Sequence, residues 1–452
     1  MGKEFSYWIP VYGSGNSFIY LLFATILMLS AICFIYSKYD ILYPPLIGTT
    51  SFLCCIGLAA FFTDLWSLPM HFNTAFTIIC MVFLFIIGGF IATQVVAKIR
   101  LKNDESDDDN KILQEAIGVP LKVWFPLILL LSFCLYENYT EFINLASLVT
   151  SSHHFSTMLF PITTGIAQGK IRFSNKFFYI LLIAKSISYT SILFFWYNLI
   201  EKKYKNCLQW GILVFFYFPF ILLTGGRQLF LYFILYSLIS LILVLRKKAL
   251  IQKGKQEVTI VFGAFSGFLL FFLGTGLLSG KINAELGFFR VLGHYAGVNI
   301  SAFDVYLNEM MIPDTPYIGL MTLSPINAII NHLGFNLPID TAYIPFFTVF
   351  GDISTNVYTA LMRYIADYGM LGCGIIMFLL GYGYTLFYEY ILFKRYKSWM
   401  IMLYAFIAYP IFLLGREERF FNEILATRTV YTFIIMIFFY KFALKLSANR
   451  KD

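Results

Sequence analysis

The sequence predicts an all-α polytopic membrane protein. Of its 452 residues, 59% are hydrophobic and only 13% are charged, whereas a soluble domain carries about a quarter charged residues. The mean hydropathy is +0.74, and the apolar runs last roughly 16 to 24 residues, about the length that a helix needs to cross a bilayer. The alternating pattern of outer-membrane strands is absent. We therefore expect one integral membrane domain over residues 1–452.

Eleven apolar runs are candidate transmembrane helices: 17–37, 45–62, 74–97, 123–137, 177–199, 208–223, 229–245, 257–278, 368–392, 398–415 and 429–444. Lysine and arginine are enriched in cytoplasmic loops. When the loops between the runs are assigned alternately to the two sides of the membrane, one assignment places 21 of the 33 basic residues in cytoplasmic segments. That assignment predicts an N-terminus outside and a C-terminus inside. The net charge of +8 is then a signal of topology, so nucleic acid is not expected as a partner.

Two external segments stand out under this topology. Residues 138–176 form a medium loop, and residues 279–367 form a large external loop that is rich in aromatic residues and proline. Loops of this length without a function are uncommon, and we expect the large one to fold as short helices over the membrane. Cytoplasmic loops are short and hold no glycine-rich phosphate loop. Any substrate must therefore reach the outer face already activated.

A single arginine marks the hairpin between the runs 208–223 and 229–245. Between Lys205 and Arg246, Arg227 is the only residue ionisable at neutral pH, and it follows two glycines that permit a tight, non-helical turn. Basic residues at both distal ends put this tip outside. A cation there does nothing for topology, which favours an anionic ligand.

The external face as a whole prefers arginine to lysine. Guanidinium groups bind phosphate through paired donors, whereas lysine offers a point charge. The alternative is that some of these arginines anchor span ends near lipid headgroups. The external arginines are Arg172, Arg227, Arg290, Arg363, Arg416, Arg419 and Arg428.

A polar stripe leads into the run at 368–392. Four residues fall at offsets 0, 3, 7 and 11, along one helical face: Asn356, Thr359, Arg363 and Asp367. Arg363 and Asp367 are four apart and can form an ion pair, while Gly369 and Gly372 allow close helix contact at the entrance to the span. The stripe is either a structural ion pair that fixes the large loop on the bundle or the lining of a sugar-binding groove.

Charged residues recur in the short segment 415–423. Arg416 beside Glu417 combines a phosphate-binding group with a carboxylate that can act as a general base, and Arg419 adds a second guanidinium group. The alternative is a solvated cap on an external hairpin. Arg290 and His294 lie one turn apart elsewhere in the large loop, and His294 is a rival base.

The sequence indicates neither a cofactor nor a metal site. The seven cysteines lie in or beside apolar runs and form no C-x-x-C pair, so neither a disulfide framework nor a thiolate site is indicated. The five histidines lie outside the runs, where an interfacial or hydrogen-bonded role is the alternative to catalysis.

Taken together, these residues resemble the Wzy-type polymerases of bacterial surface polysaccharides, the O-antigen and oligosaccharide repeat-unit polymerases. The resemblance rests on TGGRQ at 224–228, the large external loop, NVYTALMRYIADYGMLG at 356–372, and Arg416-Glu417 followed by Arg428. It implies a GT-C-type glycosyltransferase in the bacterial inner membrane, with an active site that faces the periplasm or the exterior.

The implied reaction moves a growing glycan from undecaprenyl diphosphate to the non-reducing end of a lipid-linked repeat unit, in O-antigen, lipopolysaccharide or similar polysaccharide synthesis. The implied partners are the undecaprenyl-diphosphate-linked oligosaccharide, membrane lipid and a chain-length regulator protein. Departure of a lipid diphosphate needs positive charge, so we expect Arg227, Arg290 and Arg416 to bind its oxygens in place of a metal. Glu417 would deprotonate the acceptor hydroxyl, with His294 as second candidate and Asp352 or Asp367 behind them. The Asn356, Thr359, Arg363, Asp367 and Arg419 side chains would bind the sugars.

Two other functions compete with this interpretation. An O-antigen ligase uses the same donor with a lipid A-core acceptor, and the polar stripe at 356–372 favours the polymerase over it. A flippase or other transporter of lipid-linked oligosaccharides should carry charged or polar residues within several spans. Here Lys185 is the main intramembrane exception, and snorkelling or pairing in the bundle would explain it.

Overall fold

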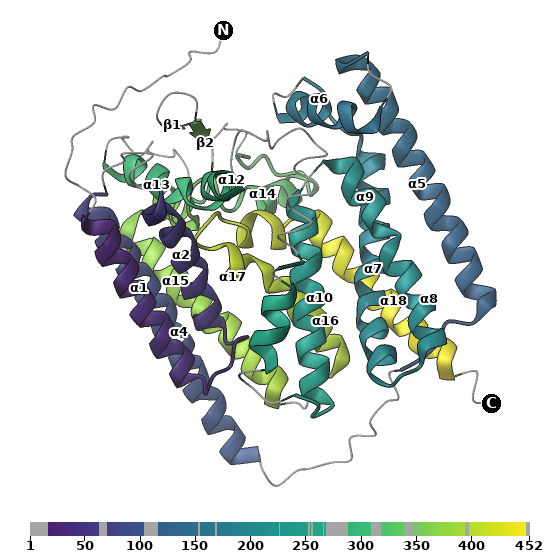
Figure 1. The fold of residues 1–452 in the computed structure, drawn as a ribbon, viewed down its shortest axis with the longest axis horizontal. Helices are drawn as coiled ribbons and strands as arrows, with labels where there is room; N and C mark the ends of the chain where they lie inside the picture. The colour runs from purple at the N-terminus through teal and green to yellow at the C-terminus, as the bar shows by residue number, and fades with distance from the viewer. Residues whose placement is uncertain are drawn as a thin grey trace. The chain divides into compact units, whose positions relative to one another are not determined.

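The computed structural model describes residues 17–62, 70–103, 116–151, 154–167, 170–225, 227–251, 254, 256–264, 266–267, 288–308, 318–339, 347–349, 353–355, 357–393 and 397–448. These residues are mainly helical (Figure 1), with one antiparallel ladder between β1 (Phe347–Val349) and β2 (Ile353–Thr355). The chain forms two compact units. Unit 1 comprises Met1–Ser106, Leu286–Phe393 and Ala408–Thr427, and unit 2 comprises Asp107–Glu285, Lys394–Ile407 and Arg428–Asp452.

Unit 1 is built around four long helices, α1 (Ser17–Tyr36), α2 (Pro44–Phe61), α4 (Phe72–Asn103) and α15 (Ala360–Phe393). The backbones of α4 and α15 approach closely because glycines stand where they meet. A Cβ at Gly88 would collide with the Phe378 carbonyl oxygen, and one at Gly381 would collide with that of Phe85. Small residues at such crossings are typical of helix packing in membranes.

Short elements cover one end of these helices (Figure 1). They are α12 (Phe288–Ala296), α13 (Val298–Asn308), α14 (Ser324–Asn331) and the β1–β2 ladder. With them we group α17 (Tyr409–Leu413), which packs against α2, and the π-helix η1 (Phe420–Ile424), which contacts α14. We call this the polar end of unit 1. At the other end, Asp40 accepts hydrogen bonds from the Tyr388 hydroxyl at 3.0 and 2.9 Å, which ties the α1–α2 turn to the end of α15.

Unit 2 contains α5 (Leu121–Val149), α6 (Phe155–Ala167), α7 (Asn175–Ile200), α8 (Tyr204–Phe215), α9 (Tyr217–Thr224), α10 (Arg227–Lys247), α16 (Ser398–Ile407) and most of α18 (Thr427–Ala448). Two hydroxyls of α7 are satisfied within the helix, since Ser186 and Thr190 donate to carbonyl oxygens one turn back. The Lys185 ammonium lies 5.3 Å from the ring centroids of both Tyr189 and Phe406. Cation–π contacts thus contribute to holding this intramembrane charge.

Among the described residues, nine helical segments are long and apolar enough to cross a membrane, as a multi-pass membrane protein requires. They correspond to nine of the eleven predicted spans. The run 398–415 is instead a shorter apolar helix, Ser398–Leu413, made of α16 and α17. Pro410 lies in the first turn of α17, where its missing backbone donor disfavours a continuous helix. The run 257–278 lies largely outside the described residues.

Three further differences from the sequence prediction concern helix limits and contacts. The first twelve residues of the predicted loop 138–176 continue α5, because Asn138, Phe142 and Ala146 are buried. The helix α15 begins eight residues before the predicted span and bends at Gly369, which has φ 66°. Gly369 and Gly372 do not provide the expected helix contact: a Cβ at Gly369 would meet nothing within 4 Å, and one at Gly372 would meet Tyr368 of the same helix.

Candidate functional site

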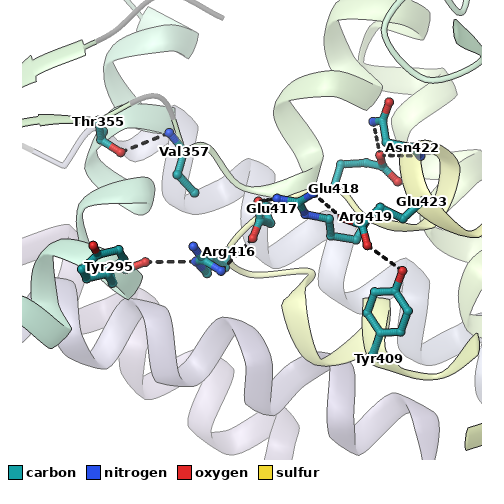
Figure 2. Close-up of polar contacts among 10 residues, drawn as sticks. All are labelled: Tyr295, Thr355, Val357, Tyr409, Arg416, Glu417, Glu418, Arg419, Asn422 and Glu423. Carbon is teal, nitrogen blue, oxygen red and sulfur yellow. Dashed lines mark hydrogen bonds and ion pairs between the residues drawn. The ribbon is translucent and has the colours of Figure 1, made fainter. Parts of the chain in front are cut away.

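The densest group of charges at the polar end of unit 1 is the segment 414–424, which we call the arginine loop (Figure 2). Arg416 Nε donates to the backbone oxygen of Tyr295 at 3.1 Å, and Arg416 Nη1 lies 2.7 Å from Glu417 Oε1. The other terminal nitrogen, Nη2, has no partner among the described residues. The Arg416 side chain is 17% exposed. The contacts with Tyr295 and Glu417 hold this arginine in place, and Nη2 stays available as a donor.

The carboxylates of the arginine loop orient its guanidinium groups. Glu417 pairs with Arg416 through Oε1 and with Arg419 through Oε2. Arg419 also pairs with Glu423, which accepts a 2.7 Å hydrogen bond from the Tyr409 hydroxyl. Guanidinium groups thus engage both Glu417 oxygens. This geometry fits a residue that positions arginines better than the general base expected from the sequence.

Glu418 points the other way, into unit 1, and is 5% exposed. It accepts hydrogen bonds from the backbone nitrogens of Phe421 at 2.6 Å and Asn422 at 3.2 Å, and from the Asn422 amide. Burial raises the pKa of Glu418 above its ordinary value, although these hydrogen bonds and the charge of Arg363 oppose the shift. The carboxylate closes the turn that starts η1, which fixes the arginine loop.

The residues of the predicted stripe have different roles. Thr359 precedes α15, and its buried hydroxyl has no partner among the described residues. Arg363 Nη1 donates to the Met321 carbonyl oxygen at 3.2 Å and otherwise keeps unused donors among the described residues. Asn356 lies outside them, and the structure does not contain the predicted ion pair between Arg363 and Asp367.

Asp367 instead binds the segment 318–323, an arrangement that we call the Asp367 clamp. Its oxygens accept hydrogen bonds from the Met321 nitrogen at 3.0 Å, the Thr322 nitrogen at 2.7 Å and the Thr322 hydroxyl at 2.7 Å. The Thr322 hydroxyl also contacts that of Tyr368 at 2.7 Å. Backbone and hydroxyl donors thus bind both oxygens of Asp367. Such a carboxylate fits a structural role better than a role in proton transfer.

The remaining predicted site residues lie on α12, on α10 or outside the described residues. His294 is partly buried on α12, next to the Tyr295 carbonyl that Arg416 binds, and burial lowers the pKa of His294 and favours its neutral form. Arg290 stands one turn earlier on the same helix, but its side chain is outside the described residues, as is Asp352. Arg227 begins α10 in unit 2, after Gly225 in the left-handed conformation with φ 62°. The expected tight turn is confirmed there, while the Arg227 side chain is outside the described residues.

Sequence reasoning missed the residues that connect these elements. Asn299 of α13 donates to the Gly415 carbonyl next to Arg416, and Asp304 of the same helix pairs with His71 at the start of α4. A lone carboxylate in the apolar sequence VNISAFDVYLN was the available signal, because a buried acid requires a partner.

The described residues contain no group of three or more histidines, cysteines or carboxylates that could hold a metal ion. The arrangement at the polar end offers guanidinium donors fixed by carboxylates and by a backbone carbonyl, with two histidines, His71 and His294, nearby on other elements. Comparison with protein-family models, with curated proteins and with solved structures finds no match to this chain.

Proposed function

We propose that this protein is a polysaccharide polymerase of the bacterial inner membrane. It transfers a growing glycan from undecaprenyl diphosphate to the non-reducing end of a lipid-linked repeat unit in surface-polysaccharide synthesis. In this proposal the polar end of unit 1 faces the periplasm or the exterior, in keeping with the lysine and arginine bias of the sequence.

The observation that carries the proposal is Arg416. Its guanidinium group is oriented by the Tyr295 carbonyl and by Glu417, while Nη2 has no partner among the described residues. A preorganised donor of this kind is suited to stabilise charge that develops on a leaving group. A diphosphate is such a group, because its charge rises as the bond to the anomeric carbon breaks. Arginine also matches the planar oxygen pairs of phosphate better than lysine does.

Arg363 is the second candidate for the diphosphate or the sugars. It is close enough to Glu418 for its charge to oppose the rise in the Glu418 pKa, and it uses one donor on the Met321 carbonyl. Arg419 is committed to Glu417 and Glu423, so we assign it to positioning. Arg290 and Arg227 stay in the proposal on the sequence grounds given above.

A genetic test separates the polymerase from the ligase. In a strain with a long-chain surface glycan, deletion of this gene is expected to leave lipopolysaccharide with a core plus one repeat unit. Complementation with the wild-type gene should restore the ladder, and Arg416→Ala at equal protein level should not. Loss of all attached glycan would indicate a ligase, and an unchanged ladder after deletion would contradict both functions.

A further inference from the structure

A histidine that the proposed site does not use is held by a buried carboxylate at the same polar end. His71 Nδ1 lies 2.8 Å from Asp304 Oδ2, and the His71 backbone nitrogen donates to Asp304 Oδ1 at 3.0 Å. Asp304 is 1% exposed and the His71 side chain is 43% exposed. The Asn308 amide supports the pair by bonding the Asp304 backbone oxygen at 2.8 Å and the Thr74 hydroxyl at 2.9 Å.

These contacts determine which nitrogen of His71 can accept a proton. An ionised carboxylate only accepts hydrogen bonds, so Nδ1 carries the proton and Nε2 is the acceptor in the neutral ring. The carboxylate also stabilises the imidazolium that forms when Nε2 takes up a proton. His71 therefore combines an oriented ring, a charge partner and access from outside.

The carboxylates already described at this end lack that combination. Arginines occupy both oxygens of Glu417, and Glu423 is shared between Arg419 and Tyr409. Backbone and side-chain donors fill Glu418 and Asp367. In contrast, Asp304 binds only the Nδ1 atom of the His71 ring. A general base of this kind is oriented through Nδ1 and accepts the proton at Nε2.

The geometry points to His71 as the general base of the proposed transferase, with Asp304 as its positioning residue; the inference rests on the proposed function. As the acceptor hydroxyl oxygen bonds to the anomeric carbon of the donor sugar, its proton passes to His71 Nε2. The bond from that carbon to the diphosphate oxygen breaks, and the electron pair leaves with the diphosphate. His71 then returns the proton to water.

The helix α13 connects His71 to the arginine loop. Its Asn299 binds the Gly415 carbonyl, and its Asp304 binds His71 five residues later, about 7.5 Å along a helix axis. The reaction needs the base beside the acceptor hydroxyl and the arginines beside the leaving diphosphate, and α13 contacts the supports of both groups. The two groups need not touch one another.

The inference predicts a loss in kcat rather than in KM. Among the described residues, Asp304 is the charged group that the structure places against the His71 ring; Thr74 and Asn308, also at this junction, are neutral. Because the pair acts on the proton that leaves the acceptor in the transition state, loss of either member should lower kcat and leave KM for the repeat unit nearly unchanged.

His71→Asn is the critical variant, because its amide can still donate to Asp304 while Nε2 is gone. With purified protein in lipid nanodiscs and an undecaprenyl-diphosphate-linked repeat unit as probe, we expect kcat/KM to fall by about 10²- to 10⁴-fold. In both His71→Asn and Asp304→Asn the loss should lie in kcat, with KM for the repeat unit nearly unchanged. His332→Asn, at an exposed histidine that ends α14, is the matched control and should retain the wild-type rate.

Two outcomes would overturn the inference. A rate within a factor of about three of wild type for His71→Asn would do so, as would losses in both variants that a lower melting temperature accounts for in full. The latter result would assign the pair to structure. If the wild-type protein elongates and these results appear, only the role of His71 fails; if the wild type does not elongate, the proposed function fails with it.

Discussion

The arginine loop and the Asp367 clamp lie at the same end of unit 1, and both are built on carboxylates, but their hydrogen-bond donors differ. In the clamp, neutral groups of Met321 and Thr322 fill the Asp367 oxygens. In the loop, guanidinium groups fill the Glu417 oxygens, and the Nη2 donor of Arg416 has no partner among the described residues.

This difference separates a structural carboxylate from one that supports a binding site. Neutral backbone donors arranged around Asp367 fix a loop and leave nothing for a ligand. A carboxylate between two arginines costs them conformational freedom but keeps their charge close to a surface where an anion can bind. The comparison predicts that changes in the loop reduce activity, whereas changes in the clamp reduce stability.

The largest effect on activity is expected from Arg416→Lys. Lysine keeps the charge but lacks the several guanidinium donors with which Arg416 contacts the Tyr295 carbonyl and Glu417 at the same time. The rate of repeat-unit addition should therefore fall about 10²- to 10³-fold. Initial rates with purified protein give the measurement. Arg428→Lys is the matched control, because a lysine can keep a cation over the Phe178 ring, which lies 3.9 Å from the Arg428 guanidinium carbon. Equal losses in both variants would count against a special role for Arg416.

The opposite result is expected from Asp367→Asn. Its amide presents donors to the Met321 and Thr322 nitrogens, so the folded state should lose about 2–3 kcal/mol. Thermal unfolding in detergent measures the loss, and activity per folded molecule should change less than about twofold. A variant with wild-type stability and a much lower rate would place Asp367 in the site instead.

A smaller effect on activity is expected from Glu417→Gln. The amide keeps one acceptor for the arginines, so the rate should fall by less than about tenfold, whereas removal of a general base costs about 10²- to 10⁴-fold. Initial rates measured beside those of Arg416→Lys decide between the two roles. A loss of a thousandfold or more would restore Glu417 as the base.

The smallest expected effect concerns Glu418 and the pH dependence of stability. Burial raises the pKa of Glu418 above the ordinary value of 4.5, so the folded protein binds this proton more tightly than the unfolded chain. The stabilisation that Glu418 gives the folded state is fully present at a pH below its ordinary pKa. It is lost as the pH rises through the raised pKa of the folded state. Melting temperatures measured from about pH 4 to about pH 8 should decline less in Glu418→Gln than in wild type. Parallel curves would show that Glu418 does not titrate in this way.

Sequence patterns predicted the long apolar helices well, because hydrophobic length alone decides whether a helix can span a bilayer. They also predicted the turn at Gly225, where two glycines stand between apolar runs. They gave too long a helix at 398–415, where the apolar helix ends at Leu413 and Pro410 interrupts it, and too short a helix at 138–149, where burial extends α5.

The candidate site was less predictable than the fold. The proximity of Arg416, Glu417 and Arg419 follows from their adjacency in the sequence. Nothing local shows that Asp367 binds Thr322, 45 residues away, in preference to Arg363 on the same helix. The partner of Arg416 is a backbone carbonyl of Tyr295, and every residue has one, so composition cannot reveal it. Long-range polar contacts depend on how the helices pack against one another. Sequence patterns along the chain do not predict that packing.

The most direct test of the central claim is elongation by the purified protein. Wild-type protein in lipid nanodiscs, with an undecaprenyl-diphosphate-linked repeat unit and EDTA, should form lipid-linked dimers and longer glycans and release undecaprenyl diphosphate. Arg416→Ala at matched amount and equal melting temperature should form none above background. Elongation by Arg416→Ala at the wild-type rate, or no elongation by the wild type, would contradict the account.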